Sequence, residues 1–417
     1  MKYKIYSDNI EHEALQQFFK AMKQPNVVQG ALMPDAHTGY TLPIGGVVVV
    51  KDAIYPSYIG YDVGCGMCAY KVPNVHPEEI RDNSDAIFNS IYRNLPVGRN
   101  GFKRARNSNK NLHDKIADVC TMIGDVPSVH IKKIGTLGGG NHFAEIGFDE
   151  NEDVWLIVHS GSRNFGHKIA SHFMYVAMEE SLKRNYDDYY REFLENNKGF
   201  KIHNPEGFEI AAHRYIQNKI QNMLKGSKEG HYYFDTNSKS GKDYIFCMNV
   251  ALEYALENRK DMVTIILNCV YSQIGKKSVP VDYADETIFI NRNHNHAEFK
   301  DGLWIHRKGA THAEEGMMGV IPGNMRDGSF IVRGKGNPES LCSSSHGAGR
   351  VLGRKQAKRT LDIHDFEKTM DGIKAKVEKS TLDESPFAYK NIFEVMDNQK
   401  DLVEVVHHVI PILNIKG

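Results

Sequence analysis

A single histidine, His346, stands between a serine run and a Gly-Ala-Gly turn in residues 340–350. The glycines allow backbone N–H groups to approach an anion without interference from side chains. Residues 350–359 are expected to be helical and carry five basic residues and no acidic one, and a helix N-terminus favours negative charge. A neutral imidazole in this position could attack a phosphorus atom. The alternative is an ordinary glycine-rich turn with a surface histidine, because short glycine motifs also occur by chance.

Several other residues have side chains that commonly bind metal ions and lie in glycine-rich turns at the ends of apolar segments. They are Asp62, Cys65, Cys68, His142, His159, His294 and His296. Carboxylate, thiolate and imidazole groups are standard ligands, although a histidine taken alone is more often a hydrogen-bonded core or surface residue. Cys65 and Cys68 form one C-x-x-C pair, whereas a zinc ribbon needs two. We therefore expect Cys65 to be a ligand and Cys68 to pack in the core.

Two further stretches could bind phosphate groups. Glycines 138–140 precede Asn141 and offer a flexible backbone cradle, and residues 322–329 are polar and rich in turn formers. An ordinary hairpin is the alternative for the second stretch. Residues 93–110 form a glycine- and asparagine-rich segment with six basic residues and no acidic one, which is either a solvated loop or a contact surface for a nucleic-acid backbone.

Both helices and strands are expected to position these residues. Residues 9–23 and 77–95 are expected to be helical, and residues 44–50 and 154–158 are apolar, β-branched segments typical of buried strands. Residues 149–153 resemble a hairpin tip. Helical periodicity dominates from about 167 to 272, where we expect few site residues, and residues 288–334 are again rich in strands.

The composition is that of a globular protein with reduced thiols. The chain has 417 residues, of which 41% are hydrophobic, and 52 basic residues balance 52 acidic ones, so net charge gives no indication of a polyanionic partner. The six cysteines are scattered, and a chain of this length does not need disulfides. We see no apolar leader and no run of 18 apolar residues, so we expect a cytoplasmic protein without a membrane segment.

Together these motifs resemble the RtcB-type RNA ligases, which join RNA with GTP and manganese. The resemblance covers residues from about 30 to the C-terminus, apart from the helical region. It is carried by the motifs Met33-Pro-Asp-Ala-His37, Asp62-Val-Gly-Cys-Gly-Met67, Gly135-Thr-Leu-Gly-Gly-Gly-Asn-His142, His159-Ser-Gly-Ser-Arg163, His294-Asn295, Arg307-Lys-Gly309 and Ser345-His-Gly-Ala-Gly-Arg350. Two departures concern specificity: Asn324 stands where the family often has serine, and Ser344 stands where its archetypes often have cysteine.

The resemblance implies a role for each matched residue. His346 is implied to become guanylylated, and two Mn²⁺ ions per chain are implied to be held by Asp62, Cys65, His142, His159 and His294. On ligand softness alone the same set would suggest zinc. The implied guanylate pocket consists of Asn141, His142, Phe143, Ala144, Glu145, His294, Asn295, Pro322, Gly323, Asn324, Met325, Ser329, His346, Gly347, Ala348, Gly349 and Lys416. Cys68 and His296 match no ligand position of the family.

The implied fold is a single α+β domain over residues 1–417, with a β-sandwich-like core around a metal cleft and a helical insertion at about 167–272. The implied reaction joins an RNA 3′-phosphate or 2′,3′-cyclic phosphate to a 5′-hydroxyl, in RNA splicing or repair, with an archease-like activator as a possible partner. Arg163, Arg350 and the 93–110 loop are our candidates for contacts with the RNA backbone. A metal-dependent phosphatase or cyclic phosphodiesterase, and a non-catalytic RNA-end-binding protein, are the competing functions, and only the ligase requires His346 to capture guanylate.

Overall fold

A seven-stranded, fully antiparallel sheet forms the larger half of the core in the computed structural model, which describes residues 2–417. The strand order is β13-β14-β16-β6-β7-β5-β9. The strands are β5 (Gly66–Lys71), β6 (Phe143–Phe148), β7 (Val154–Ser160), β9 (Phe289–Asn293), β13 (Met318–Pro322), β14 (Ser329–Gly334) and β16 (Val403–Lys416). The two end strands, β13 and β9, contact each other, so the sheet is nearly closed.

Alternation of side chains along these strands separates two hydrophobic clusters. On β5, Met67 and Ala69 point into the space enclosed by the sheet, together with Ile157 of β7. Cys68 and Tyr70 point outward and pack against helices, as the two-residue period of a strand requires. The prediction that Cys68 packs in the core is therefore confirmed.

A second sheet, of five strands, lies beside the first, with the order β1-β2-β3-β11-β10. Its strands are β1 (Lys2–Ile5), β2 (Val27–Tyr40), β3 (Leu42–Val50), β10 (Asn295–Lys300) and β11 (Leu303–Lys308). Helix α1 (His12–Met22) buries Phe18 and Met22 against this sheet. Two short pairs complete the β-structure: β4 (Ala53–Ile54) with β8 (Phe234–Asp235), and β12 (Ala310–His312) with β15 (Ser343–Ser345).

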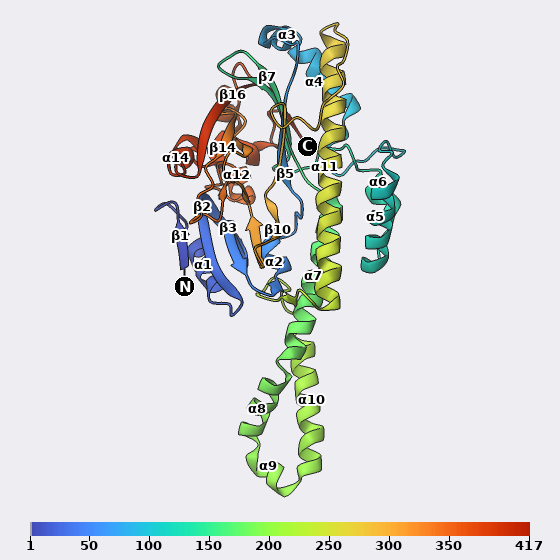
Figure 1. Ribbon diagram of the computed structural model, residues 1–417, viewed down its shortest axis with the longest axis vertical. Helices are drawn as coiled ribbons and strands as arrows, with labels where there is room; N and C mark the ends of the chain where they lie inside the picture. Colours follow the sequence, from blue (N-terminus) through green and yellow to red (C-terminus); the bar gives the residue numbers. More distant parts are fainter. Residues whose placement is uncertain (1) are drawn as a thin grey trace.

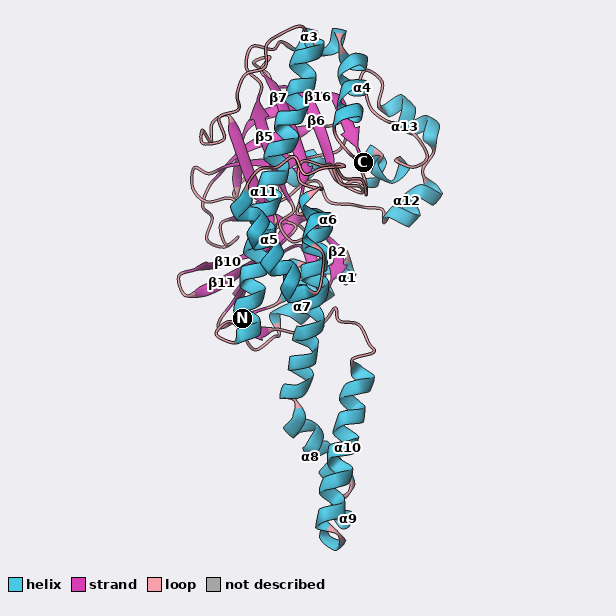
Figure 2. Cartoon of the chain, turned by 90° about the vertical axis from the view of Figure 1, so that its right-hand side faces the viewer, coloured by secondary structure: helices cyan, strands magenta, loops and turns pink. Residues whose placement is uncertain are grey.

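Helices cover one side of the seven-stranded sheet and also form a projecting arm. The 35-residue helix α11 (Lys239–Gln273) runs along the sheet (Figures 1 and 2) and buries residues over its whole length. Helices α8 (Tyr186–Asn196), α9 (Lys198–His203) and α10 (Pro205–Met223) extend away from both sheets (Figure 1). The other helices are α2 (Pro56–Ile59), α3 (Pro77–Asp82), α4 (Ser84–Asn94), α5 (Lys110–Ile123), α6 (Pro127–Ile131), α7 (Arg163–Arg184), α12 (Arg354–Thr360), α13 (Ile363–Thr369) and α14 (Ile392–Asp397), with 3₁₀ turns at Leu382–Glu384 and Pro386–Ala388.

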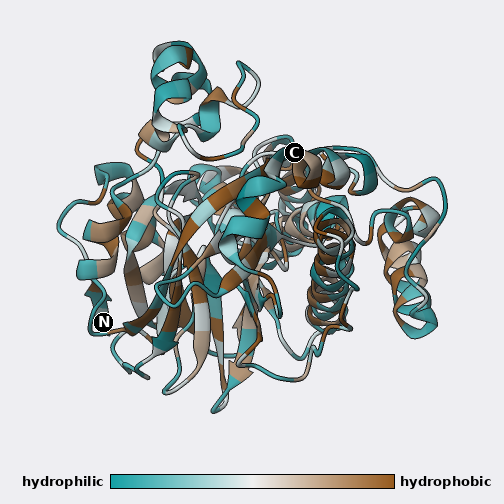
Figure 3. Cartoon of the chain, turned by 90° about the horizontal axis from the view of Figure 1, so that it is seen from above, coloured by the Kyte–Doolittle hydropathy of each residue, from teal (hydrophilic) through white to brown (hydrophobic). Residues whose placement is uncertain are grey.

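The α+β class is confirmed, as are the buried strands at 44–50 and 154–158 and the helices at 9–23 and 77–95, the latter split in two. Figure 3 shows the hydrophobic residues concentrated along the strands. The region 167–272 is helical as predicted, but α11 belongs to the main core and only α8–α10 stand apart. The helix expected from residue 350 begins at Arg354, so its first turn does not include the Gly-Ala-Gly residues.

Within residues 2–417, no helix combines the length and the apolar character that crossing a membrane would need.

Candidate active site

Five predicted metal ligands come together where β5, β6, β7 and β9 begin or end. The Sγ atom of Cys65 lies 3.3 Å from Nε2 of His142 and 3.2 Å from Nε2 of His159. Nε2 of His159 lies 3.4 Å from Nε2 of His294, and Nε2 of His142 lies 3.2 Å from Oδ2 of Asp62. We call Asp62, Cys65, His142, His159 and His294 the central cluster. Its donor atoms converge on one small volume, which suits a metal ion.

Burial and neighbouring charges set the protonation of the central cluster. Burial lowers the pKa of His159 and of His294 well below the ordinary value, so both imidazoles are neutral. Burial raises the pKa of Cys65 well above that of a free thiol. Burial also acts to raise the pKa of Asp62, but its hydrogen bond with His142 and the charge of that ring bring the pKa down to about 2. Two neutral imidazoles and an ionised carboxylate are therefore ready to bind a cation.

Two side chains of α11 hold the loops that carry these ligands. The guanidinium of Arg259 is fully buried and donates to the backbone oxygen of Ser160 at 2.7 Å and to Oδ1 of Asn293 at 2.8 Å. Those residues adjoin His159 and His294. Asn258 accepts from the backbone N–H groups of Gly135 and Thr136 at 2.8 and 3.0 Å. Within the helical region, where few site residues are expected, Arg259 and Asn258 therefore support these loops from behind.

His346 lies next to the central cluster, with its ring centroid 4.8 Å from that of His294. Its Nδ1 lies 2.6 Å from Oδ2 of Asp35, and the same oxygen accepts the His346 backbone N–H at 3.2 Å. Asp35 is completely buried on β2. Because a carboxylate can only accept, Nδ1 carries the hydrogen and Nε2 carries the lone pair. The geometry therefore fixes which ring nitrogen has its lone pair free.

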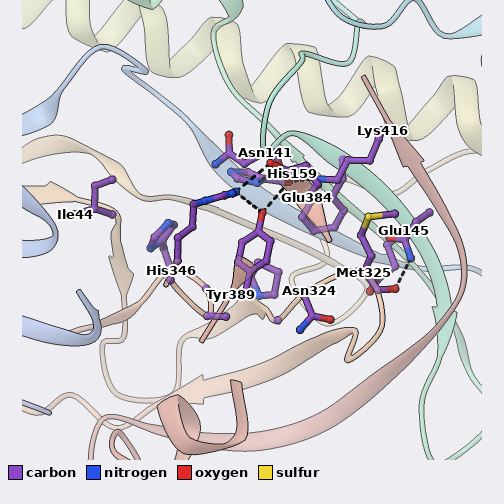
Figure 4. Close-up of a pocket in the computed structure, with 18 of the residues that line it drawn as sticks. Ile44, Asn141, Glu145, His159, Asn324, Met325, His346, Glu384, Tyr389 and Lys416 are labelled. Carbon is purple, nitrogen blue, oxygen red and sulfur yellow. Dashed lines mark hydrogen bonds and ion pairs between the residues drawn. The ribbon is translucent and has the colours of Figure 1, made fainter. Parts of the chain in front are cut away.

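A cavity of about 230 Å³ extends from His346. In Figure 4, His346 and Ile44 lie toward one end, Glu145 and Met325 toward the other, and Tyr389 between them. The predicted pocket residues that line it are Asn141, Phe143, Glu145, Pro322, Gly323, Asn324, Met325, His346, Gly347, Ala348, Gly349 and Lys416. Most of the predicted guanylate-binding residues thus line one continuous wall of this cavity.

The remaining predicted pocket residues lie behind or beside this wall. Ala144 sits between Phe143 and Glu145 on β6 and so points to the opposite face, into the core. Ser329 is buried and donates its hydroxyl to Glu145 at 2.9 Å. Asn295 donates to the backbone oxygen of Asp62 at 3.1 Å and accepts from the N–H of Gly309 at 2.9 Å. These three residues support the wall without lining it, and His142 and His294 belong to the central cluster.

The middle and the far end of the cavity contain ionisable groups that are held by burial and by neighbouring charges. Burial raises the pKa of Glu145 to about 8. Burial acts to raise the pKa of Glu384 as well, but the charges of Lys416 and Arg354 bring it to about 2. Nζ of Lys416 pairs with Glu384, and the Tyr389 hydroxyl donates to the same carboxylate at 2.7 Å. These two parts of the cavity therefore offer hydrogen-bond donors and acceptors in fixed positions.

Sequence reasoning gave no role in this cavity to seven of its residues: His37, Ile44, Arg350, Arg354, Glu384, Tyr389 and Asn414. It also assigned no role to Asp35. Asp35 and His37 lie in a motif that the sequence analysis singled out. The carboxylate two positions before a histidine is the signal that could have drawn attention to both residues. Glu384 and Tyr389 lie in an irregular segment without any periodic or motif signal.

A second cleft, of about 550 Å³, opens on the other side of His142 and Asp62. Arg99, Lys133 and Arg163 contribute positive charge to its lining. Arg163 is anchored there by donating to the backbone oxygen of Gly98 at 2.6 Å. Of the expected RNA contacts, Arg163 and part of the 93–110 loop are therefore at this cleft. Arg350 is not, because its guanidinium bonds to Glu384 and to the backbone oxygen of Asp383.

The fold and the site define an α+β protein with a histidine–cysteine cluster between a deep pocket and a basic cleft. The model of the family described as tRNA-splicing ligase RtcB matches residues 17–126 and 117–417. The RNA-splicing ligase RtcB of Escherichia coli K12 is 33% identical, over 98% of this chain and 95% of that protein. The tRNA-splicing ligases RtcB of Nanoarchaeum equitans and Pyrobaculum aerophilum are each 26% identical, over 94% and 99% of this chain and 89% and 94% of theirs. The chain belongs to the RtcB family.

Proposed function

We propose that this protein is an RNA ligase that uses GTP to join a 3′-phosphate or 2′,3′-cyclic phosphate end to a 5′-hydroxyl end. The observation that carries the proposal is the position of His346. Its Nδ1 is fixed by Asp35 at 2.6 Å, and its ring stands between the central cluster and the deep pocket. Family membership and the names of the relatives support an RNA-joining activity.

The central cluster fits divalent metal ions, because a carboxylate, a thiol and three imidazoles point their donor atoms at one another. Asp62, Cys65, His142, His159 and His294 would hold them, and we propose two Mn²⁺ ions per chain. When bound, the metal supplies charge stabilisation for phosphate oxygens beside His346.

In the first step, Nε2 of His346 attacks the α-phosphorus of GTP. A P–N bond forms, the bond to the bridging oxygen of the β-phosphate breaks, and pyrophosphate leaves. Asp35 keeps the hydrogen on Nδ1, so the attacking nitrogen needs no deprotonation. The guanylate then passes to the RNA 3′-phosphate, and the 5′-hydroxyl attacks that activated phosphate and releases GMP. A cyclic phosphate would first be hydrolysed to the 3′-phosphate.

The end of the pocket remote from His346 would bind guanine. Glu145, whose pKa burial raises to about 8, would release its proton when guanine binds and then accept hydrogen bonds from the N1–H and the exocyclic amino group. Adenine lacks this donor pair. The Ser329 hydroxyl, 2.9 Å from Oε1, orients the carboxylate. The backbone of residues 347–349 lines the opposite end and suits the phosphates.

RNA would approach from the basic cleft, which reaches the central cluster from the side opposite the nucleotide pocket. Arg99, Lys133 and Arg163 line that cleft. Contacts to backbone phosphates would give affinity without base specificity. Two openings on one cluster would let the RNA end meet the guanylylated histidine without displacing the guanine.

The test is incubation with α-³²P-GTP and Mn²⁺ followed by denaturing electrophoresis. We expect an acid-labile labelled band in the wild type, none in His346→Ala, and a normal band in His364→Gln, an exposed histidine on α13. RNA with a 3′-phosphate or 2′,3′-cyclic phosphate end and a 5′-hydroxyl end should be ligated by the wild type and by His364→Gln, but not by His346→Ala. If the wild type is not labelled but still hydrolyses cyclic-phosphate RNA, the ligase proposal is wrong and the protein is a phosphodiesterase.

A further inference from the structure

Two copies of the tripeptide His-Ala-Glu occur 16 residues apart, at His296–Glu298 and at His312–Glu314. The first begins on β10 and the second at the end of β12. In extended chain, residues two apart point to the same side. Each tripeptide therefore presents an imidazole and a carboxylate on one side, and the fold brings the two copies together.

The two imidazoles face each other through their Nε2 atoms, which lie 2.9 Å apart with the rings nearly parallel at 23°. Oε2 of Glu298 lies 3.9 Å from Nε2 of His312. His296 is 4% exposed, and the side chains of His312 and Glu298 are 18% and 28% exposed. The three donor groups thus meet just below the surface, where an ion can enter.

Neighbouring groups orient two of these donors. Oε1 of Glu314 lies 3.1 Å from Nδ1 of His312, so that nitrogen carries a hydrogen and directs the other nitrogen toward His296. The fully buried guanidinium of Arg307 donates to Oε1 of Glu298 and leaves Oε2 free. A carboxylate–histidine pair and a second anchored carboxylate are typical outer-shell partners of a metal site.

The convergence of these groups suits a cation, because two imidazole lone pairs and a carboxylate oxygen can share one positive charge. The alternative without a metal is a hydrogen bond between two neutral rings, in which the Nε2–H of His296 donates to Nε2 of His312. Two neutral imidazoles with one carboxylate form a three-ligand set that zinc binds readily, with water in the fourth position.

We propose that His296, His312 and Glu298 bind a divalent transition-metal ion, zinc in the first instance, at a site separate from the central cluster. The ion would tie β10 to β12. β12 pairs with β15, which leads directly to His346. Arg307 also donates to the Ser343 hydroxyl at 2.9 Å. The ion would therefore stabilise the segment that positions the nucleophile, and this role does not depend on the proposed reaction.

The test compares zinc binding by the wild type and by His312→Gln, with His364→Gln as the control for loss of an exposed histidine. After equilibration with zinc and removal of excess, mass spectrometry of the metal should give one ion fewer per chain in His312→Gln than in the other two. X-ray absorption of a Cys65→Ser/His159→Asn background should show the remaining zinc with nitrogen and oxygen neighbours, including two imidazoles, and no sulfur. Zinc should raise the Tm of that background.

Equal zinc contents in the wild type and His312→Gln would overturn the site and leave a hydrogen bond between the two rings in its place. If His312→Gln does not fold, as judged by circular dichroism, Glu298→Gln replaces it as the test variant, because the amide keeps the shape of the side chain. In the Cys65→Ser/His159→Asn background, Glu298→Gln should raise the zinc Kd at least about tenfold, in line with loss of one ligand charge. An unchanged Kd would exclude Glu298 and with it the proposed site.

Discussion

The two ends of the deep pocket are built in different ways. At the His346 end, the reacting ring depends on single hydrogen bonds between distant parts of the chain, such as Asp35 on β2. At the Glu145 end, the side chains stand on β6 and β16, which are paired along their length. Removal of one contact at the His346 end should therefore cause a large loss of activity. A single substitution at the Glu145 end, which is built on paired strands, should cause a smaller loss.

The largest effect is expected at the His346 end, for Asp35→Asn. An amide in this position can present its NH₂ group to Nδ1 and thereby place the hydrogen on Nε2, the attacking nitrogen. We expect the rate of guanylate labelling to fall by about 10²–10⁴-fold, the range for loss of a well-placed acid–base partner. Single-turnover labelling at saturating GTP measures this rate. An unchanged rate would refute the tautomer argument.

Arg259→Lys should have the next largest effect, because a lysine cannot reach the acceptors beside both His159 and His294 at once. Loss of outer-shell support typically weakens metal binding by about 10–100-fold. Competition with a metal indicator gives the Kd of the central cluster. Lys260→Arg, at the next and partly exposed position of α11, is the control and should bind metal normally.

Glu145→Gln tests the other end of the pocket. The amide presents one acceptor and one donor to guanine in place of two acceptors, so we expect KM for GTP to rise by about tenfold or more, consistent with about 1.5–3 kcal/mol for a charged hydrogen bond. Labelling at saturating GTP should change little. Ser329→Ala should produce a smaller rise in KM. A fall in the maximal rate without a change in KM would contradict the division of the pocket into two ends.

The same carboxyl group should make stability depend on pH. Burial raises the pKa of Glu145 from about 4.5 to about 8, so the folded protein holds this proton more tightly than the unfolded chain. The resulting stabilisation is complete below pH of about 4.5 and is lost as the pH rises through 8. Between pH 6 and 9, the wild type should lose Tm relative to Glu145→Gln in thermal denaturation without nucleotide. If the Tm of the two proteins changes with pH in the same way, the raised pKa of Glu145 is refuted.

The smallest effect is expected on the arm. Ile202 and Ile210 are 77% and 72% exposed on α9 and α10, far from both pocket ends (Figure 1). Ile202→Ser and Ile210→Ser should change stability by no more than about 0.5 kcal/mol, as exposed substitutions usually do. Labelling should equal that of the wild type. A large loss of labelling would show that the arm contributes to the reaction.

The sequence allowed much of the central cluster and pocket wall to be predicted, because glycine-rich motifs keep their residues together. His142 and Glu145, for example, lie within one short stretch. Arg259 could not be found in this way, since a helix of 35 residues shows only its amphipathic period and not which loop a side chain touches. Glu384 and Tyr389 reach the pocket from an irregular segment, and only tertiary packing places them there.

Strand β16 has a consequence for the order in which the protein is assembled. It pairs with β14 on one side and β6 on the other, in the interior of the seven-stranded order, and it carries Lys416 into the pocket. During synthesis, the strands from residues 66 to 334 are made before residues 403–416 exist to join them. Until then, the edges of β6 and β14 are open to other strands. The nascent protein therefore has two sheet edges that can pair with other strands until residues 403–416 are made and complete the deep pocket.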